Sequence, residues 1–258
     1  MIAMTNGHSR PQGCIMPTMD YAFVADRVAS VRERIAAAAR RSGRTPDSVE
    51  LLAVTKTHPI EAVLAAWDAG LRAFGESRVQ EAEAKYEAFF ADRPDARLDL
   101  IGGLQSNKVK KAVGLFSRIQ SVDSLELLLA IDARARAAGK RVEALLELHT
   151  GEESKAGFRG LDDLYRALEE IYSIDDRRVE PRGLMTMAPN VADRAPIRAS
   201  FSALREAIEG ARSRFGARSL DALSMGMSGD FEIAVEEGST SVRLGTALFG
   251  TSSAGASR

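Results

Sequence analysis

The sequence LLAVTKTHP (residues 51–59) starts as a buried strand and ends in a polar turn that holds a lysine. Its apolar run, Leu51 to Val54, is typical of a strand covered on both faces, as the strands of a parallel sheet are. Pro59 fits the first turn of a helix, and IEAVLAAWDAG follows at 60–70, with Gly70 as a stop signal. A buried strand that runs through a short turn into a helix predicts a βα unit.

The same unit recurs along the chain. The apolar runs predict eight strands, at 51–54, 71–77, 98–104, 118–122, 141–150, 179–188, 221–227 and 241–250, the last range including the turn that ends it. The segments between them have helical periodicity or cap signals, including Ser124 in front of a helix. One additional helix precedes the first strand, with apolar residues at helical spacing and Gly43 at its end (Val24, Val28, Val31, Ile35).

Eight strands that alternate with helices predict an α/β protein with a closed, single-domain (β/α)8 TIM barrel and an extra N-terminal helix. An open, doubly wound sheet is the competing topology. No Gly-x-Gly-x-x-Gly fingerprint follows the first strand, which weakens a dinucleotide-binding interpretation. We expect a disordered leader at 1–20, the barrel at 21–250 and a disordered tail at 251–258.

The composition narrows the function classes. The 258 residues carry 35 Lys and Arg against 36 Asp and Glu, a formal net charge of -1, which gives no reason to expect nucleic acid or an anionic membrane as partner. Cys14 is the single cysteine, so no disulfide framework is expected. No apolar run approaches the roughly 18 residues of a membrane span. A cytoplasmic location is the default expectation.

In such a barrel, chemistry gathers where the strands end. The first strand ends near Lys56, and lysine is the side chain that forms Schiff bases with carbonyl compounds. Lys56 could therefore be a Schiff-base lysine, a general base or an anchor for an anion. The alternative is a solvated lysine where a strand reaches the surface.

The last two strands end in small and hydroxyl-bearing residues, namely Ser224, Gly226, Ser228, Gly245 and Thr246. The loops after strands seven and eight of this fold often hold phosphate, because small residues let backbone N–H groups approach an anion. The alternative is that these glycines only make tight turns.

Arg243 has the same parity as Gly245 and is expected to point into the barrel, where a buried guanidinium needs an acceptor. A ring nitrogen or a carboxylate would serve. A reactive lysine opposite a phosphate cradle suggests a phosphorylated carbonyl compound. Both pyridoxal phosphate and the substrate of a Schiff-base aldolase answer that description.

Seven motifs resemble the pyridoxal phosphate homeostasis proteins, whose barrel is related to the N-terminal domain of alanine racemase. They are LLAVTKTHP, FGESRVQEAEAKY, LIGGLQSNKVKK, IQSVDS, GEESKAGF, GLMTMAP and LSMGMSGDFEIAVEEGSTSVRLGTALFG. The resemblance implies pyridoxal 5′-phosphate as cofactor, joined to Lys56 as a Schiff base. It implies that Ser224, Gly245 and Thr246 hold the phosphate, with Met225 nearby.

The resemblance also implies that Arg243 faces the pyridine nitrogen, which keeps that nitrogen unprotonated and weakens the ring as an electron sink. The chain departs from the family at three places. Ser77 stands where the family commonly has asparagine and is expected to contact the cofactor. Leu98 and Asp99 stand in the region of a Trp-His pair, and His149 lies near an asparagine position.

The implied function is to bind and hand over the cofactor in vitamin B6 homeostasis, without robust catalysis. Pyridoxal phosphate-dependent apo-enzymes are the implied protein partners, and we expect a monomer. The alternative is an amino-acid racemase, which needs a base on each face of the substrate. The four tyrosines lie on predicted helices or at a helix start, away from strand ends (Tyr21, Tyr86, Tyr165, Tyr172). The three histidines and one cysteine have no metal-ligand spacing.

Overall fold

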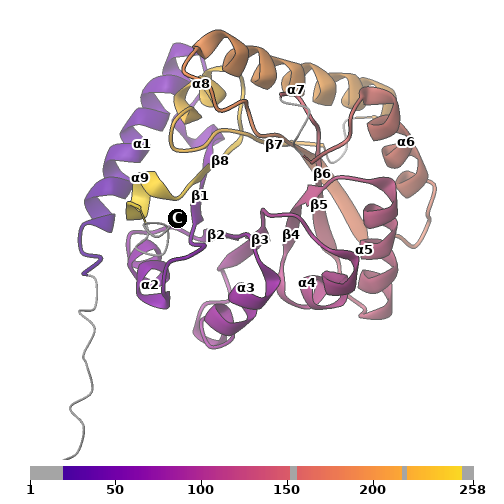
Figure 1. Cartoon of the computed structure of the whole chain (residues 1–258), viewed down its shortest axis with the longest axis horizontal. Coiled ribbons are helices and arrows are strands. Elements are labelled where there is room, and N and C mark those ends of the chain that lie inside the picture. The colour runs from indigo at the N-terminus through magenta and orange to yellow at the C-terminus, as the bar shows by residue number, and fades with distance from the viewer. Residues whose placement is uncertain (1–19, 152–155, 217–219, 252–258) are drawn as a thin grey trace, which may run out of the picture.

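The computed structural model describes residues 20–151, 156–216 and 220–251. Nearly all of the predicted leader and tail, at 1–19 and 252–258, lies outside the described residues. Eight parallel strands close into a barrel in chain order, with β1 paired to both β2 and β8 (Figure 1). The strands are β1 (Glu50–Val54), β2 (Ala73–Glu76), β3 (Arg97–Leu100), β4 (Arg118–Val122), β5 (Val142–Glu147), β6 (Val179–Met185), β7 (Ala222–Ser224) and β8 (Ser241–Leu244).

Helices surround the barrel (Figure 1). They are α1 (Val24–Arg41), α2 (Ile60–Asp68), α3 (Val79–Tyr86), α4 (Val109–Leu115), α5 (Leu125–Ala137), α6 (Leu161–Tyr172), α7 (Arg194–Phe215), α8 (Phe231–Glu236) and α9 (Thr246–Phe249). Three 3-10 turns are η1 (Pro46–Ser48), η2 (Phe90–Asp92) and η3 (Ser106–Lys108). The predicted (β/α)8 barrel is confirmed, and the open doubly wound sheet is excluded.

The extra N-terminal helix forms as its pattern predicts. The four apolar residues spaced along α1 are all buried, and α1 packs outside the barrel against α2, α8 and α9 (Figure 1). The helix ends where Gly43 takes a φ of 71°, which a glycine adopts without strain. The predicted serine cap is also present, because Ser124 Oγ accepts the N–H of Leu127 at 3.3 Å.

Element ends differ from the sequence prediction. The seventh strand stops at Ser224, because Gly226 has a φ of 100° and turns the chain beside Ala234 of α8. The end of the last predicted strand, after Gly245, is the short helix α9. Both differences shorten the strands, so that the final predicted residues lie in the loop after β7 and in α9 after β8.

The strands separate two packed regions, one between the barrel and the helices and one inside the barrel. The main apolar core fills the space between barrel and helices, with Phe74, Phe201 and Phe231 among its fully buried side chains. Inside the barrel, apolar residues form two separate small clusters, one of Leu52, Val54 and Ala73 and one of Leu145, Met185 and Ala222. Polar side chains separate these two clusters, so the barrel interior is not a continuous apolar plug.

Charged residues fill the end of the barrel where the strands begin. Arg97 of β3 bonds both carboxylate oxygens of Glu50 on β1, at 2.9 and 2.6 Å, and the Oδ1 of Asp99 at 2.8 Å. Arg118 of β4 pairs with Glu143 of β5 at 2.6 Å. Asp99 is fully buried, and burial raises the pKa of its carboxyl, although Arg97 opposes that shift. This ionic layer occupies the strand-start end and leaves the opposite end for a ligand.

At Gly183, strand β6 lies very close to the backbone of β7. An added Cβ there would lie 1.8 Å from the carbonyl oxygen of Ala222 on the neighbouring strand, a backbone atom that cannot rotate away. We expect Gly183→Ala to lower the free energy of unfolding by about 1–3 kcal/mol, the usual cost of overpacking. The measurement is a urea denaturation curve.

Gly114→Ala is the matched control, since a Cβ at Gly114 on α4 would meet nothing within 4 Å. We expect that substitution to leave stability unchanged or to raise it, because alanine favours a helix. Equal effects of the two substitutions would contradict the proposed clash.

Candidate functional site

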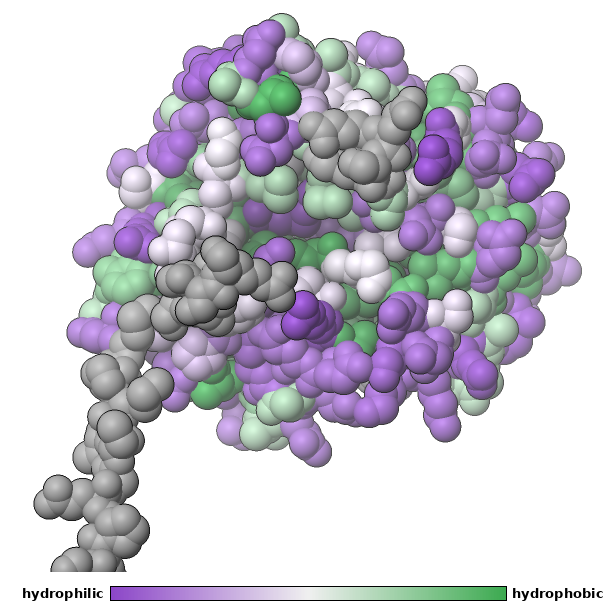
Figure 2. Space-filling model, viewed as in Figure 1, coloured by the Kyte–Doolittle hydropathy of each residue, from purple (hydrophilic) through white to green (hydrophobic). Residues whose placement is uncertain are grey.

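The residues predicted from the strand ends come together at one end of the barrel. They belong to four neighbouring strands or the loops that follow them, in the order β7, β8, β1 and β2. Figure 2 shows a hollow near the centre of the face that lies over the barrel. The strand ends are therefore grouped on one side of the mouth, opposite β4 and β5.

Lys56 follows β1 by two residues and is exposed. Leu52 and Val54 of the same strand line the barrel interior, so strand alternation directs Lys56 toward that side. Among the described residues, no hydrogen bond or ion pair holds its side-chain amine. The next residue, Thr57, has a φ of 64°, a left-handed conformation rare for a β-branched residue. Lys56 is thus a free amine at a sharply turned strand end.

Arg243 of β8 is the buried cation of the site, with 5% of its surface exposed. Its Nη1 donates to Ser224 Oγ at 2.7 Å, and its Nη2 donates to the carbonyl of Thr186 at 2.8 Å. These bonds use two of the five N–H donors of a guanidinium. Burial lowers the pKa of Arg243 to about 10, and the nearby Glu147 carboxylate opposes that shift. The predicted inward direction of Arg243 is confirmed.

A hydrogen-bonded chain connects Arg243 with the ionic layer below it. Ser224 accepts from Arg243 and donates to Gln120 Oε1 at 2.6 Å. Gln120 Nε2 in turn donates to Asp99 Oδ2 at 2.6 Å. The single hydroxyl proton of Ser224, expected to serve a phosphate, is here donated to Gln120 of β4. Ser224 orients the guanidinium in this arrangement.

The remaining predicted phosphate residues lie between β7 and β1. Gly245 packs against β1, since an added Cβ would lie 3.2 Å from the carbonyl oxygen of Val54. Thr246 is exposed at the start of α9, and the N–H of Ala247 donates to Ser228 Oγ at 3.1 Å. Together these residues form a small-residue surface beside Lys56.

Met225 and Ser77 occupy different environments. The Met225 side chain is fully buried in the main core outside the barrel, so only its backbone borders the mouth. Ser77 is half-buried just after β2, with the inward parity of Ala73. Its backbone lies against Gly102, where an added Cβ would come within 2.4 Å of the Ser77 carbonyl oxygen. Ser77 therefore borders the mouth on the other side of β1 from Gly245.

Glu147 is a site residue that the sequence prediction missed. Its side chain at the end of β5 is 4% exposed, and its negative charge interacts with the positive charge of Arg243. Burial raises the pKa of the Glu147 carboxyl, Arg243 and His149 oppose the shift, and Asp123 adds to it. Strand alternation could have found Glu147, since it shares the parity of Leu145, which lines the barrel.

His58 lies two residues after Lys56 and is buried. Its ring packs against Tyr21 and Phe249, with a ring-centre distance of 5.1 Å to Phe249. Burial, followed by the charge of Lys85, lowers the pKa of His58. A buried imidazole with a lowered pKa is a packing residue next to Lys56.

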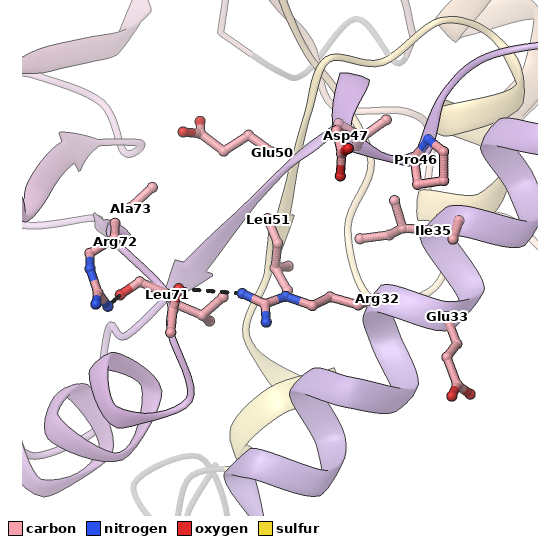
Figure 3. Close-up of a pocket in the computed structure, with 13 residues that line it drawn as sticks. Arg32, Glu33, Ile35, Pro46, Asp47, Glu50, Leu51, Leu71, Arg72 and Ala73 are labelled. Carbon is pink, nitrogen blue, oxygen red and sulfur yellow. Dashed lines mark hydrogen bonds between the residues drawn. The ribbon is translucent and has the colours of Figure 1, made fainter.

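A second hollow, of about 550 Å³, lies between α1 and the starts of β1 and β2 (Figure 3). The two arginines that line it already have partners. Arg32 donates to the carbonyl of Gly70 at 3.3 Å, and Arg72 pairs with Asp95 at 2.9 Å. Because it lies at the strand-start end, this hollow is separate from Lys56 and Arg243.

Comparison with known proteins identifies the family. The family model of the alanine racemase N-terminal domain matches residues 27–253. A pyridoxal phosphate homeostasis protein of Pseudomonas aeruginosa is 40% identical over 234 residues, which cover 90% of this chain and 97% of that protein. This chain belongs to the pyridoxal phosphate homeostasis protein family. The resemblance seen in the sequence motifs is confirmed.

Solved structures agree with this homeostasis family. PipY of Synechococcus elongatus PCC7942, solved with pyridoxal phosphate bound, is 39% identical, with a TM-score of 0.77 and coverage of 88% of this chain and all of that one. A histidine racemase of Leuconostoc mesenteroides is 18% identical, with a TM-score of 0.63, over 90% of this chain and 58% of its own. The racemase shares the barrel fold, and at that identity it shows the fold alone.

Within 20–151, 156–216 and 220–251, no group of three or more His, Cys, Asp or Glu side chains could hold a metal ion. No helix in these ranges is long and apolar enough to cross a membrane.

Glu147 provides a test of the site's electrostatics. Because its folded-state pKa is raised, the ionised carboxylate destabilises the fold above that pKa, and the penalty is absent below the unfolded pKa of about 4.3. We therefore expect Glu147→Gln to raise the melting temperature at pH 8. The gain should shrink as the pH falls toward 4. Thermal melts across this pH range measure it.

Glu180→Gln is the control, since Glu180 on the neighbouring β6 is only half-buried. A Glu147→Gln variant whose melting temperature falls below that of the wild type at pH 8 would show that the carboxylate stabilises the site instead.

Proposed function

We propose that this protein binds pyridoxal 5′-phosphate, holds it as a Schiff base on Lys56, and takes part in vitamin B6 homeostasis without robust catalysis. One observation carries the proposal: a free lysine amine at the end of β1 borders the same barrel mouth as a buried arginine of β8 with unused donors. The pyridoxal phosphate bound to PipY supports it. Membership of the homeostasis family supports the physiological role.

The residues of the mouth fit the chemistry of this cofactor. Arg243 presents N–H donors and no acceptor, so a ring nitrogen beside it must accept a hydrogen bond. Pyridoxal phosphate supplies an electron-withdrawing ring when bound, and an arginine at that nitrogen keeps the withdrawal weak. Strong stabilisation of a carbanion is favoured by a negatively charged partner that keeps the ring nitrogen protonated. Arg243 therefore favours holding the cofactor over catalytic turnover.

The other predicted contacts follow from their places around the mouth. Lys56 would supply the amine that joins the cofactor's aldehyde as a Schiff base, with the carbonyl oxygen released as water. Gly245 and Thr246 lie next to β1 and offer small or exposed surfaces to the phosphate. Met225 would contribute through its backbone, and Ser77 would face the opposite edge of the ring. Ser224 would contact the phosphate only by giving up its bond to Gln120.

The racemase alternative requires a second base, and no tyrosine lies where it could act as one. All four tyrosines lie in, or pack against, the core outside the barrel. The Tyr86 hydroxyl lies 2.7 Å from Thr55 Oγ1, and the Tyr165 hydroxyl donates to the carbonyl of Ala207. No tyrosine is therefore available on the free face of a cofactor in the mouth.

The Schiff-base aldolase alternative predicts covalent trapping of a sugar phosphate.

We propose that the chain acts in the cytoplasm as a monomer and passes its cofactor to pyridoxal phosphate-dependent apo-enzymes. Membership of the homeostasis family supports the handover of the cofactor.

The colour of the protein tests the cofactor. We expect wild-type protein incubated with pyridoxal phosphate to be yellow, and Lys56→Ala to stay colourless, because that variant lacks the amine that would bind the aldehyde. Lys110→Ala, at an exposed position on α4, is the control and should remain yellow. An absorbance spectrum after gel filtration measures this. Wild-type protein that remains colourless would rule out the cofactor.

A racemase assay tests the alternative. With L-alanine in excess, we expect no sustained formation of D-alanine by the yellow protein over hours, because no tyrosine lies where it could act as the second base. Chiral chromatography of the mixture measures it, with an authentic alanine racemase as positive control. Sustained turnover that disappears in Lys56→Ala would establish the enzymatic function instead.

A further inference from the structure

Helix α3 holds the backbone on both sides of Lys56. The Nζ of Lys85 donates to the carbonyl of Thr55 at 2.8 Å, and Glu81 Oε1 accepts the N–H of Thr57 at 2.6 Å. Lys85 and Glu81 also pair with each other at 3.2 Å. We call these two residues the α3 clamp, because their bonds grip the peptide groups that precede and follow Lys56.

The clamp has a rigid base. Only 9% of the Lys85 side chain is exposed, and its Nζ bonds Glu76 Oε1 at 2.8 Å. Glu76 is fully buried at the end of β2, and the same oxygen accepts from Thr55 Oγ1 at 2.7 Å. Charge-assisted bonds of this kind are strong when water is excluded. The lysine is thus fastened to the strand next to β1.

Thr57 needs such support. Its φ of 64° is unfavourable for a β-branched side chain and persists only where surrounding contacts enforce it. Strained residues of this kind gather at functional sites. The Glu81 carboxylate bonds the N–H of this very residue, so the clamp acts directly on the strained position.

The clamp acts from outside the barrel and leaves the amine of Lys56 free. Thr55 points outward, because its hydroxyl contacts Glu76 and Tyr86, and the alternation of β1 sends Lys56 inward. Gripping backbone groups fixes the origin and direction of the lysine side chain without using its nitrogen. Preorganisation of this kind favours a reaction that needs a defined approach.

We propose that Glu81 and Lys85 are positioning residues that aim Lys56 at the aldehyde of pyridoxal phosphate. They touch neither cofactor nor reacting atoms, and act through the peptide groups on either side of Lys56. This inference rests on the proposed function. It deepens that function by assigning the reactivity of one lysine to an ion pair on a neighbouring helix.

The experiment compares two ligands that differ at one group. Pyridoxal 5′-phosphate has the aldehyde that Lys56 captures, whereas pyridoxine 5′-phosphate has an alcohol there and can bind only non-covalently. We expect Glu81→Ala to weaken pyridoxal phosphate binding about tenfold, the effect of losing one charge-assisted hydrogen bond. Its affinity for pyridoxine phosphate should change less than about twofold, because the phosphate and ring contacts remain. Titration calorimetry measures both.

Glu83→Ala is the matched control. Glu83 lies on the same helix and pairs with Lys111 at 2.7 Å, but both side chains are about half exposed and neither contacts the β1 turn. We expect this variant to bind both ligands as the wild type does. An equal loss of both ligands in Glu81→Ala, or no loss of either, would overturn the proposal.

The role of Lys85 is tested with a double variant, because Lys85→Met alone would leave the buried Glu76 carboxylate without its cationic partner. The double variant Glu76→Gln/Lys85→Met removes the buried charge pair together and should show the same selective loss as Glu81→Ala. Equal loss of both ligands in the double variant would likewise contradict positioning.

Lys56→Ala separates this inference from the proposed function. If that variant binds both ligands as tightly as the wild type, the Schiff-base function itself fails. If it loses its preference for the aldehyde while the clamp variants keep theirs, only the positioning role fails.

Discussion

A positive charge enclosed by the barrel constrains this structure more than any apolar contact. Arg243 is buried among strands that otherwise carry small apolar clusters, and its guanidinium must be given acceptors there. The chain supplies them through Ser224 and the carbonyl of Thr186, which commits β7 and β6 to a fixed geometry around β8. Gln120 then extends the arrangement to β4.

This chain of bonds explains why the two ends of the barrel differ. At the strand-start end, arginine and carboxylate side chains satisfy one another in a dense ionic layer, so these side chains are already paired with one another. At the opposite end, Arg243 keeps donors without protein partners, and Lys56 keeps its amine free. A ligand with an acceptor, a carbonyl carbon and an anionic tail would complement the second end.

The two cations of the mouth are controlled in different ways. Arg243 is held through its own side chain, because a buried guanidinium needs direct hydrogen bonds. Lys56 has to keep its nitrogen available, and its position is set through the backbone by contacts from α3. Buried charge therefore serves orientation in both cases, once from inside the barrel and once from outside it.

Much of this architecture was predictable from local pattern. Apolar runs such as Leu51 to Val54, cap residues such as Ser124 and the parity of Arg243 are local or periodic signals, and these are what a linear sequence records. They were sufficient for the barrel, for the extra helix and for the set of strand ends where the candidate site lies. Boundaries were less predictable, since the end of β7 depends on Gly226 meeting α8.

The tertiary structure alone decided which polar residues satisfy one another. Ser224 was expected to bind phosphate, but its proton is donated to Gln120, 104 positions earlier in the chain. Glu147 and the α3 clamp were not found, because their significance comes from contacts across the barrel or across a turn. The sequence by itself determined the fold and the location of the chemistry, since periodicity and strand ends are local properties. The partners of each buried charge depend on distances between strands and helices, and only barrel closure sets those distances.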